Sequence, residues 1–165
     1  THINHVWSYD FTEDQTENGQ RVRILAVMDE FTRQCLMLYA STSIPSTKVV
    51  DILDWLVMCH GMPEHIRSDN GPEFVANKVK QWITSRGSET IYIEPGHPWE
   101  NPFIERFNGT LKHDCLNRYL FDTVSEAQQL LDNWRVEYNA YRPHSALGYI
   151  TPDAFAAKHS QIIPT

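Results

Sequence analysis

The chain has 165 residues, of which 41% are hydrophobic and 21% charged, values typical of one compact globular domain with its own core. Its 14 basic and 21 acidic residues give a formal net charge of −7, which argues against a simple nucleic-acid binder with a basic face. No apolar run approaches the ~20 residues of a membrane span, and the odd number of cysteines, three, argues against a disulfide framework. We expect one domain over residues 1–165, and the start at Thr1 suggests a piece excised from a longer protein.

Three strands are expected first. Residues 5–12, 21–29 and 34–41 are rich in alternating aromatic and β-branched side chains, the pattern of half-buried strands. Asn18-Gly19 supplies the positive-φ residues of a tight hairpin between the first two. Short connections throughout predict an antiparallel three-stranded meander.

The hydrophobic period then changes to that of a helix. After Ser46 an apolar stripe follows helical spacing up to the stop at Gly61. Its members are Val49, Leu53, Leu56 and Val57. A short strand over residues 65–68 and a turn over 69–72 come next.

A second helix is expected over residues 72–86, with Gly87 as its stop. Its apolar positions are Phe74, Val75, Val79, Trp82 and Ile83. Residues 90–94 form the fifth predicted strand, and the proline-rich residues 95–102 are too interrupted for regular structure.

Three more helices complete the chain. Proline is favoured in a first helical turn, so a helix is expected over residues 102–118. Thr123 and Glu126 form a capping box for a helix ending near Ala140, and Thr151 caps a last short helix. Helices and strands around one sheet imply a layered α/β domain. We expect Trp55, Trp82 and Trp134, all on helices, to be core residues.

Three carboxylates could together form a metal site. Asp10 lies in the first strand, Asp69 ends the fourth and Glu105 lies on a helix. Taken alone, Asp10 is most simply a solvated edge residue, Asp69 part of a turn, and Glu105 an exposed helix residue. Ligand sites gather at the carboxyl ends of strands in open α/β sheets, so Asp10 and Asp69 can meet there if their strands are neighbours. Three clustered carboxylates require cations, and oxygen ligands without nearby cysteine favour Mg²⁺ or Mn²⁺.

Several spaced segments resemble a known family. WSYDFT, SDNGPEF and PGHPWENPFIERFNGTLK, with 35 residues between Asp69 and Glu105, are similar to the D,D,E signature of retroviral integrases and bacterial insertion-sequence transposases. The later stretch EYNAYRPHSALGYITP resembles the segment that closes the core of insertion-sequence transposases. The resemblance covers nearly the whole chain, although the acidic balance departs from a DNA-binding protein.

The resemblance implies a ribonuclease-H-like fold, with a mixed five-stranded sheet made of the antiparallel meander and parallel strands, flanked by helices. It also implies a polynucleotidyl transferase: water cuts a DNA strand, and the freed 3′-OH then attacks target DNA. Two Mg²⁺ or Mn²⁺ ions about 4 Å apart would serve both steps. Asp10 would bind both ions, Asp69 one and Glu105 the other.

DNA contacts are expected beside this site. Glu105, Gly109 and Lys112 have the spacing of one helix face, so Gly109 would leave room for DNA and Lys112 would bind a phosphate. Lys112 also matches the integrase lysine that binds the DNA end. Asn101 could contact a base or sugar, and Arg106 could bind DNA or be structural.

Two other functions remain open on the sequence. One is a metal-dependent nuclease of the same fold that only hydrolyses DNA, and the other is a non-catalytic DNA-binding or dimerisation module. For the transposase, we expect element ends and target duplex as partners, at least a homodimer, no membrane association, and a place in the bacterial cytoplasm near the nucleoid.

Overall fold

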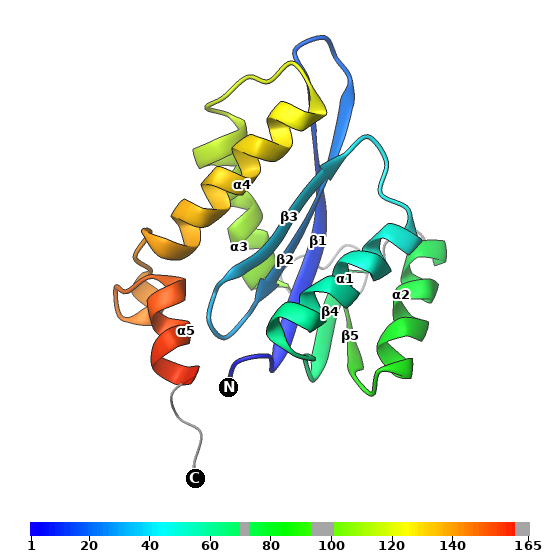
Figure 1. Cartoon of the computed structure of the whole chain (residues 1–165), viewed down its shortest axis with the longest axis vertical. Helices are drawn as coiled ribbons and strands as arrows, with labels where there is room; N and C mark the ends of the chain where they lie inside the picture. Colours follow the sequence, from blue (N-terminus) through cyan, green and yellow to red (C-terminus); the bar gives the residue numbers. More distant parts are fainter. Residues whose placement is uncertain (70–72, 94–100, 161–165) are drawn as a thin grey trace.

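A mixed five-stranded sheet forms the centre of the computed structural model, which describes residues 1–69, 73–93 and 101–160 (Figure 1). Its strands are β1 (Val6–Gln15), β2 (Arg21–Asp29), β3 (Cys35–Ser41), β4 (His65–Asp69) and β5 (Glu89–Ile93). They lie in the order β3-β2-β1-β4-β5. β1, β2 and β3 pair antiparallel, whereas β4 is parallel to β1 and β5 is parallel to β4. The expected meander with added parallel strands is therefore confirmed.

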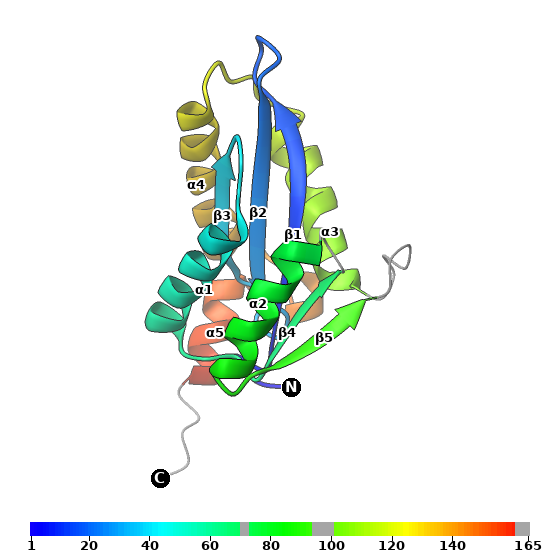
Figure 2. The ribbon, with the colours of Figure 1, turned by 90° about the vertical axis from the view of Figure 1, so that its right-hand side faces the viewer.

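Helices cover both faces of the sheet (Figures 1 and 2). One face carries α1 (Ser46–His60) and α2 (Glu73–Ser85), and the other carries α3 (Pro102–Leu111) and α4 (Val124–Ala140). The last helix, α5 (Pro152–Ser160), packs beside α4. Two short segments complete the helical part, a π-helical turn over Lys112–Leu116 and a 3-10 turn over Ser145–Leu147.

Strand alternation divides the buried side chains into two cores. Trp7 and Tyr9 of β1 pack with Leu25 of β2 beneath α1 and α2. The intervening positions of β2, including Ala26 and Met28, pack beneath α3 and α4. Asp10 lies between Tyr9 and Phe11 in β1, so its side chain points to the opposite face of the sheet and faces α3.

The capping signals act as expected. Thr123 precedes α4, and its hydroxyl oxygen accepts a hydrogen bond from the Glu126 amide at 3.1 Å. Glu126 in turn accepts from the amide of Asp122 at 2.9 Å, one residue earlier than in the usual reciprocal box. Gly61 ends α1 with a φ of +90°, a conformation that favours glycine.

Two sequence expectations are wrong in detail. The helix predicted over 102–118 loses its α-helical bonding after Leu111, and the Asn117 amide donates to the Lys112 carbonyl five residues back. Trp55 is 53% exposed, although Trp82 and Trp134 are each only 8% exposed. Trp55 is not a core residue because α1 buries the stripe formed by Val49, Ile52, Leu53 and Leu56, and position 55 lies off it.

Some expectations lie outside the described residues. These are most of the turn at 69–72, most of the loop at 95–102, and the side chains of Phe74, Val75 and Asp69. In the part of the chain that the structure describes, no helix has the length and apolar character needed to cross a membrane.

Candidate active site

Asp10 lies on β1 and faces α3. It pairs with Ala26 of β2, which belongs to the core under α3 and α4. The side chain is half-buried, and its Oδ2 accepts a hydrogen bond of 2.9 Å from Nδ2 of Asn108 on α3. A helix residue thus fixes the orientation of the strand carboxylate.

Asp69 is the last residue of β4, the parallel neighbour of β1. The two strands pair from Val6 with His65 through Ser8 with Arg67. Counted two residues further, the same register aligns Asp10 with Asp69, on neighbouring strands that in sheets lie about 4.8 Å apart. The strand adjacency on which the sequence argument depended is therefore present.

Glu105 lies in the first turn of α3 and is exposed. Its amide donates to the carbonyl of Asn101 at 3.2 Å. Residues three apart on a helix share one side, so Glu105 lies one turn before Asn108, the residue that holds Asp10. This side of α3 consequently faces the middle of β1, where Asp10 lies.

Asn108 is the residue that the sequence reasoning missed. It is only 6% exposed, and its Oδ1 has no hydrogen-bond partner among the described residues. The available signal was Asn108-Gly109 inside a predicted helix, because both residue types disfavour helix interiors. A buried asparagine retained there indicates a specific side-chain contact.

The expected DNA contacts have different surroundings. Lys112 is exposed, seven residues after Glu105 on the same side of the helix. A Cβ built on Gly109 would meet no atom within 4 Å, so the surface there is open. Asn101 is 4% exposed, and its Oδ1 lacks a partner in the described ranges. Contact between Asn101 and DNA would therefore require that its amide become accessible. Arg106 lines a cavity with two other arginines.

A largely buried ion pair links the parts of the sheet that carry the two aspartates. Glu30, only 9% exposed, follows β2 and accepts hydrogen bonds from Nε of Arg67 at 2.8 Å and from the hydroxyl of Ser8. Ser8 and Arg67 are paired positions two residues before Asp10 and Asp69. The network therefore joins the two strands that carry the aspartates.

A separate histidine cluster lies at the opposite end of β4. Ligand atoms of His5, Glu64 and His65 all lie within 4.8 Å of one another, a group able to hold a metal ion. His65 begins β4, whereas Asp69 ends it. The cluster is therefore distinct from the expected carboxylate site, and spacing in the sequence does not indicate it because residue 5 is remote from 64 and 65.

Comparisons with known proteins agree on one family. Two models described as integrase core domain match the chain, over residues 1–98 and 86–152. The 31.7 kDa protein of insertion element IS407 from Burkholderia multivorans is 40% identical over 156 residues, which is 94% of this chain and 56% of the relative. The 39.2 kDa protein of insertion element IS476 from Xanthomonas euvesicatoria is also 40% identical, over 94% of this chain and 45% of the relative. The chain thus spans about half the length of these relatives.

Solved structures share the fold. A chain of the simian T-cell lymphotropic virus intasome in complex with PP2A regulatory subunit B56 gamma superposes with a TM-score of 0.79 at 22% identity, over 99% of this chain and 57% of that one. The HTLV-2 integrase catalytic core domain in complex with magnesium gives 0.74 at 19% identity, over 94% of this chain and 97% of that one. At these identities the likeness establishes the fold.

The sheet order and its helices, together with these neighbours, define a ribonuclease-H-like protein, as the resemblance implied. The match over residues 1–98 covers more than half of the chain and specifies the family. The chain belongs to the integrase core domain family.

Proposed function

We propose that this chain is the catalytic core of a DNA transposase, which cuts a DNA strand and joins the freed 3′-OH to target DNA. Membership of the integrase core family and the similarity to insertion-element proteins support this function. The observation that carries it is the bond from Asn108 to Asp10, which ties the strand carboxylate to the helix bearing Glu105. The register of β1 and β4 favours Asp69 as the third member.

The donor set fits Mg²⁺ or Mn²⁺. Asp10, Asp69 and Glu105 offer only oxygen ligands, which hard divalent ions prefer. Two of the three cysteines are unsuitable ligands, because burial raises the pKa of the Cys35 thiol to about 12 and of the Cys115 thiol to about 11. The third, Cys59, lies on α1, on the opposite face of the sheet from α3.

Each residue then has a definite task. Two bound ions would lower the pKa of the attacking hydroxyl and stabilise the leaving oxygen. Asp10, Asp69 and Glu105 would hold the ions, and Asn108 would hold Asp10 in position. No protein nucleophile is required, so the serines nearby have no chemical role.

DNA and a second protomer complete the proposal. Lys112, on the same side of α3 as Glu105, would bind a phosphate near the cut, with Arg106 and Asn101 as further contacts. The partners would be element ends and target duplex. Transposition joins two ends, so we expect at least a homodimer, acting inside the bacterial cell.

Strand transfer is the direct test. The chain is incubated with Mn²⁺, a pre-cut DNA end and a target duplex, and products longer than either substrate are expected. Asp10→Asn, Asp69→Asn and Glu105→Gln should each abolish them while keeping the far-ultraviolet circular dichroism spectrum. Asp14→Asn is the matched control, because Asp14 lies on the same strand and face as Asp10. Normal transfer by any of the three variants would refute the assignment.

The same variants separate the two rival functions. A nuclease that only hydrolyses would give shortened products and none that are longer. A non-catalytic module would bind DNA but would show no heat of Mn²⁺ binding in calorimetry. Glu105→Gln would then leave the Mn²⁺ titration unchanged. Heat of Mn²⁺ binding that disappears in Glu105→Gln would exclude the module.

A further inference from the structure

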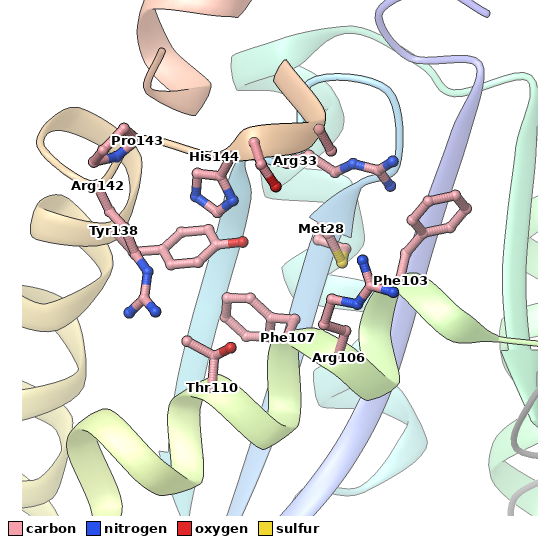
Figure 3. Close-up of a pocket in the computed structure, with 12 residues that line it drawn as sticks. Met28, Arg33, Phe103, Arg106, Phe107, Thr110, Tyr138, Arg142, Pro143 and His144 are labelled. Atoms are coloured by element: carbon pink, nitrogen blue, oxygen red, sulfur yellow. The ribbon is translucent and has the colours of Figure 1, made fainter. Parts of the chain in front are cut away.

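A cavity of about 230 Å³ lies between α3 and the segment that follows α4 (Figure 3). α3 contributes Phe103, Arg106 and Thr110 to its lining, and the turn between β2 and β3 contributes Arg33. Arg142 and His144 come from the segment after α4. We call the cavity lined by Arg33, Arg106, Arg142 and His144 the arginine pocket.

The arginine pocket and the candidate active site occupy different flanks of α3. Phe103, Arg106 and Thr110 have helical spacing and form one stripe along the pocket. Glu105 and Lys112 lie on another stripe, beside the residue that contacts Asp10. A helix with its side chains is about 10 Å wide, so a DNA strand that crosses α3 can reach both flanks.

Arg33 forms no ion pair within 4.0 Å with an acid of the described residues, although the charges of Glu30 and Asp29 act to raise its pKa. Its Nη1 is buried and has no hydrogen-bond partner there, and its guanidinium lies 3.8 Å from the centroid of the Phe103 ring. The backbone holds Arg33 at a φ of +63°, unusual for a residue other than glycine. Burial is the main cause that lowers the Arg33 pKa from its ordinary value, but the guanidinium stays charged at neutral pH.

His144 supplies a second buried nitrogen without a partner. Its Nε2 makes no hydrogen bond within the described ranges, and its ring packs edge-on against Tyr138 at 4.9 Å. Burial, followed by the charges of Arg142 and Arg33, lowers the His144 pKa. The imidazole is therefore neutral at pH 7 and can donate one hydrogen bond to an anion.

The remaining two arginines differ in their partners. Arg106 is exposed and forms no ion pair with the described residues. Arg142 pairs with Asp114, and that carboxyl has its pKa lowered to about 2, first by His113 and then by Arg142. Among the described residues, the pocket thus keeps two arginines that form no ion pair, in a chain whose net charge is −7.

We propose that the arginine pocket binds one phosphate group of the DNA backbone, on the strand that crosses α3 from the active site. This inference rests on the proposed function. Guanidinium groups bind phosphate oxygens through two parallel hydrogen bonds, and they bind more strongly where water is partly excluded. Arg33 and Arg106 would hold the same phosphate, with His144 as an additional donor.

Salt dependence of DNA binding tests whether the two arginines share one phosphate. Binding of a fluorescein-labelled duplex is measured by anisotropy over a range of NaCl concentrations, with Ca²⁺ in place of Mg²⁺. Arg33→Gln and Arg106→Gln should each lower affinity roughly tenfold and reduce the slope of log K against log salt by about 0.9. The double variant should show that same single loss of slope.

Two further variants serve as controls. Arg106→Lys keeps the charge without the two-pronged geometry, so it should restore the slope but only part of the affinity. Arg86→Gln also removes one positive charge, but Arg86 follows α2 on the opposite face of the sheet and should leave both quantities unchanged. Melting curves of all variants check that each is folded, and exposed Arg106 provides the substitution least able to disturb the fold.

A second arm separates the DNA backbone from free phosphate. Inorganic phosphate is added to the protein while its melting temperature is followed. Stabilisation that depends on Arg106, with DNA affinity unaffected by the variants, would overturn the assignment to DNA.

The remaining outcomes are equally decisive. Unchanged slopes in both single variants, or twice the slope loss in the double variant, would overturn the shared pocket. If the unmutated chain cuts and joins DNA while pocket variants behave like Arg86→Gln, only the pocket fails. If the unmutated chain neither binds nor cuts DNA, the proposed function fails with it.

Discussion

The hydrogen bond between Asn108 and Asp10 shows how a single side chain can connect two parts of the candidate site. Asn108 belongs to α3 and Asp10 to β1, 98 positions apart in sequence. In metal centres, a residue that orients a ligand typically changes metal affinity or activity by about 10- to 100-fold when it is removed. Asn108 would be such a positioning residue.

Replacement of Asn108 by alanine should therefore weaken Mn²⁺ binding and strand cleavage by roughly 10- to 100-fold. Mn²⁺ affinity is measured by calorimetry, and cleavage rates are compared at saturating metal. The matched control is Asn117→Ala, since Asn117 is exposed just beyond the π-helical turn. Lower stability together with unchanged Mn²⁺ affinity would show that Asn108 is only a packing residue.

Among the secondary-structure elements, β1 and β4 are linked by the ion pair between Glu30 and Arg67. Ser8 and Arg67 lie side by side in the parallel register, and both donate to Glu30. Arg67 has a 23% exposed side chain, so the pair is partly screened by solvent. Loss of one partner from a largely buried pair removes an attraction that offsets the cost of burying the other charge.

We expect Glu30→Gln to lower the free energy of unfolding by about 3 kcal/mol, because Arg67 then loses the carboxylate that offsets its partial burial. The double variant Glu30→Gln/Arg67→Met should recover part of this loss, since no charge remains in the pair. Urea unfolding curves give both values. A double variant that is less stable than Glu30→Gln would mean that Arg67 stabilises the fold through other contacts.

The strands and helices follow mainly from local sequence patterns, whereas their contacts do not. Alternation predicted the meander, and Thr123 predicted the start of α4, because these signals operate within a few residues. The adjacency of β1 and β4 stayed a condition in the sequence argument, since a parallel neighbour is chosen by packing of the whole sheet. Asn108 was missed for the same reason: its partner is distant in the chain.

Position 55 illustrates the limit of residue type as a guide to burial. Tryptophan is usually well buried, but α1 has a narrow apolar face and Trp55 lies outside it, 53% exposed. The arginine pocket illustrates a related limit. Its residues come from the β2–β3 turn, α3 and the segment after α4, so only the folded chain brings their charges together.

At the scale of the whole molecule, net charge and metal binding are linked. The chain carries a formal charge of −7, and three carboxylates gathered at one point would repel one another without cations. A ligand that binds only the folded state stabilises it, by about 2.7 kcal/mol at a concentration 100 times its dissociation constant. Metal should therefore make this protein more stable as well as active.

Melting temperature measured with and without Mn²⁺ tests this link. The unmutated chain should melt at a higher temperature with Mn²⁺, and Asp10→Asn should lose most of that increase. Without metal, Asp10→Asn should be at least as stable as the unmutated chain, because one repelling charge is removed. The asparagine amide also keeps an oxygen that can accept the hydrogen bond from Asn108. Asp14→Asn should respond to Mn²⁺ like the unmutated chain.

A full Mn²⁺ response in Asp10→Asn would mean that the stabilising ion binds elsewhere, for example at His5, Glu64 and His65. In that case His65→Ala would remove the response instead.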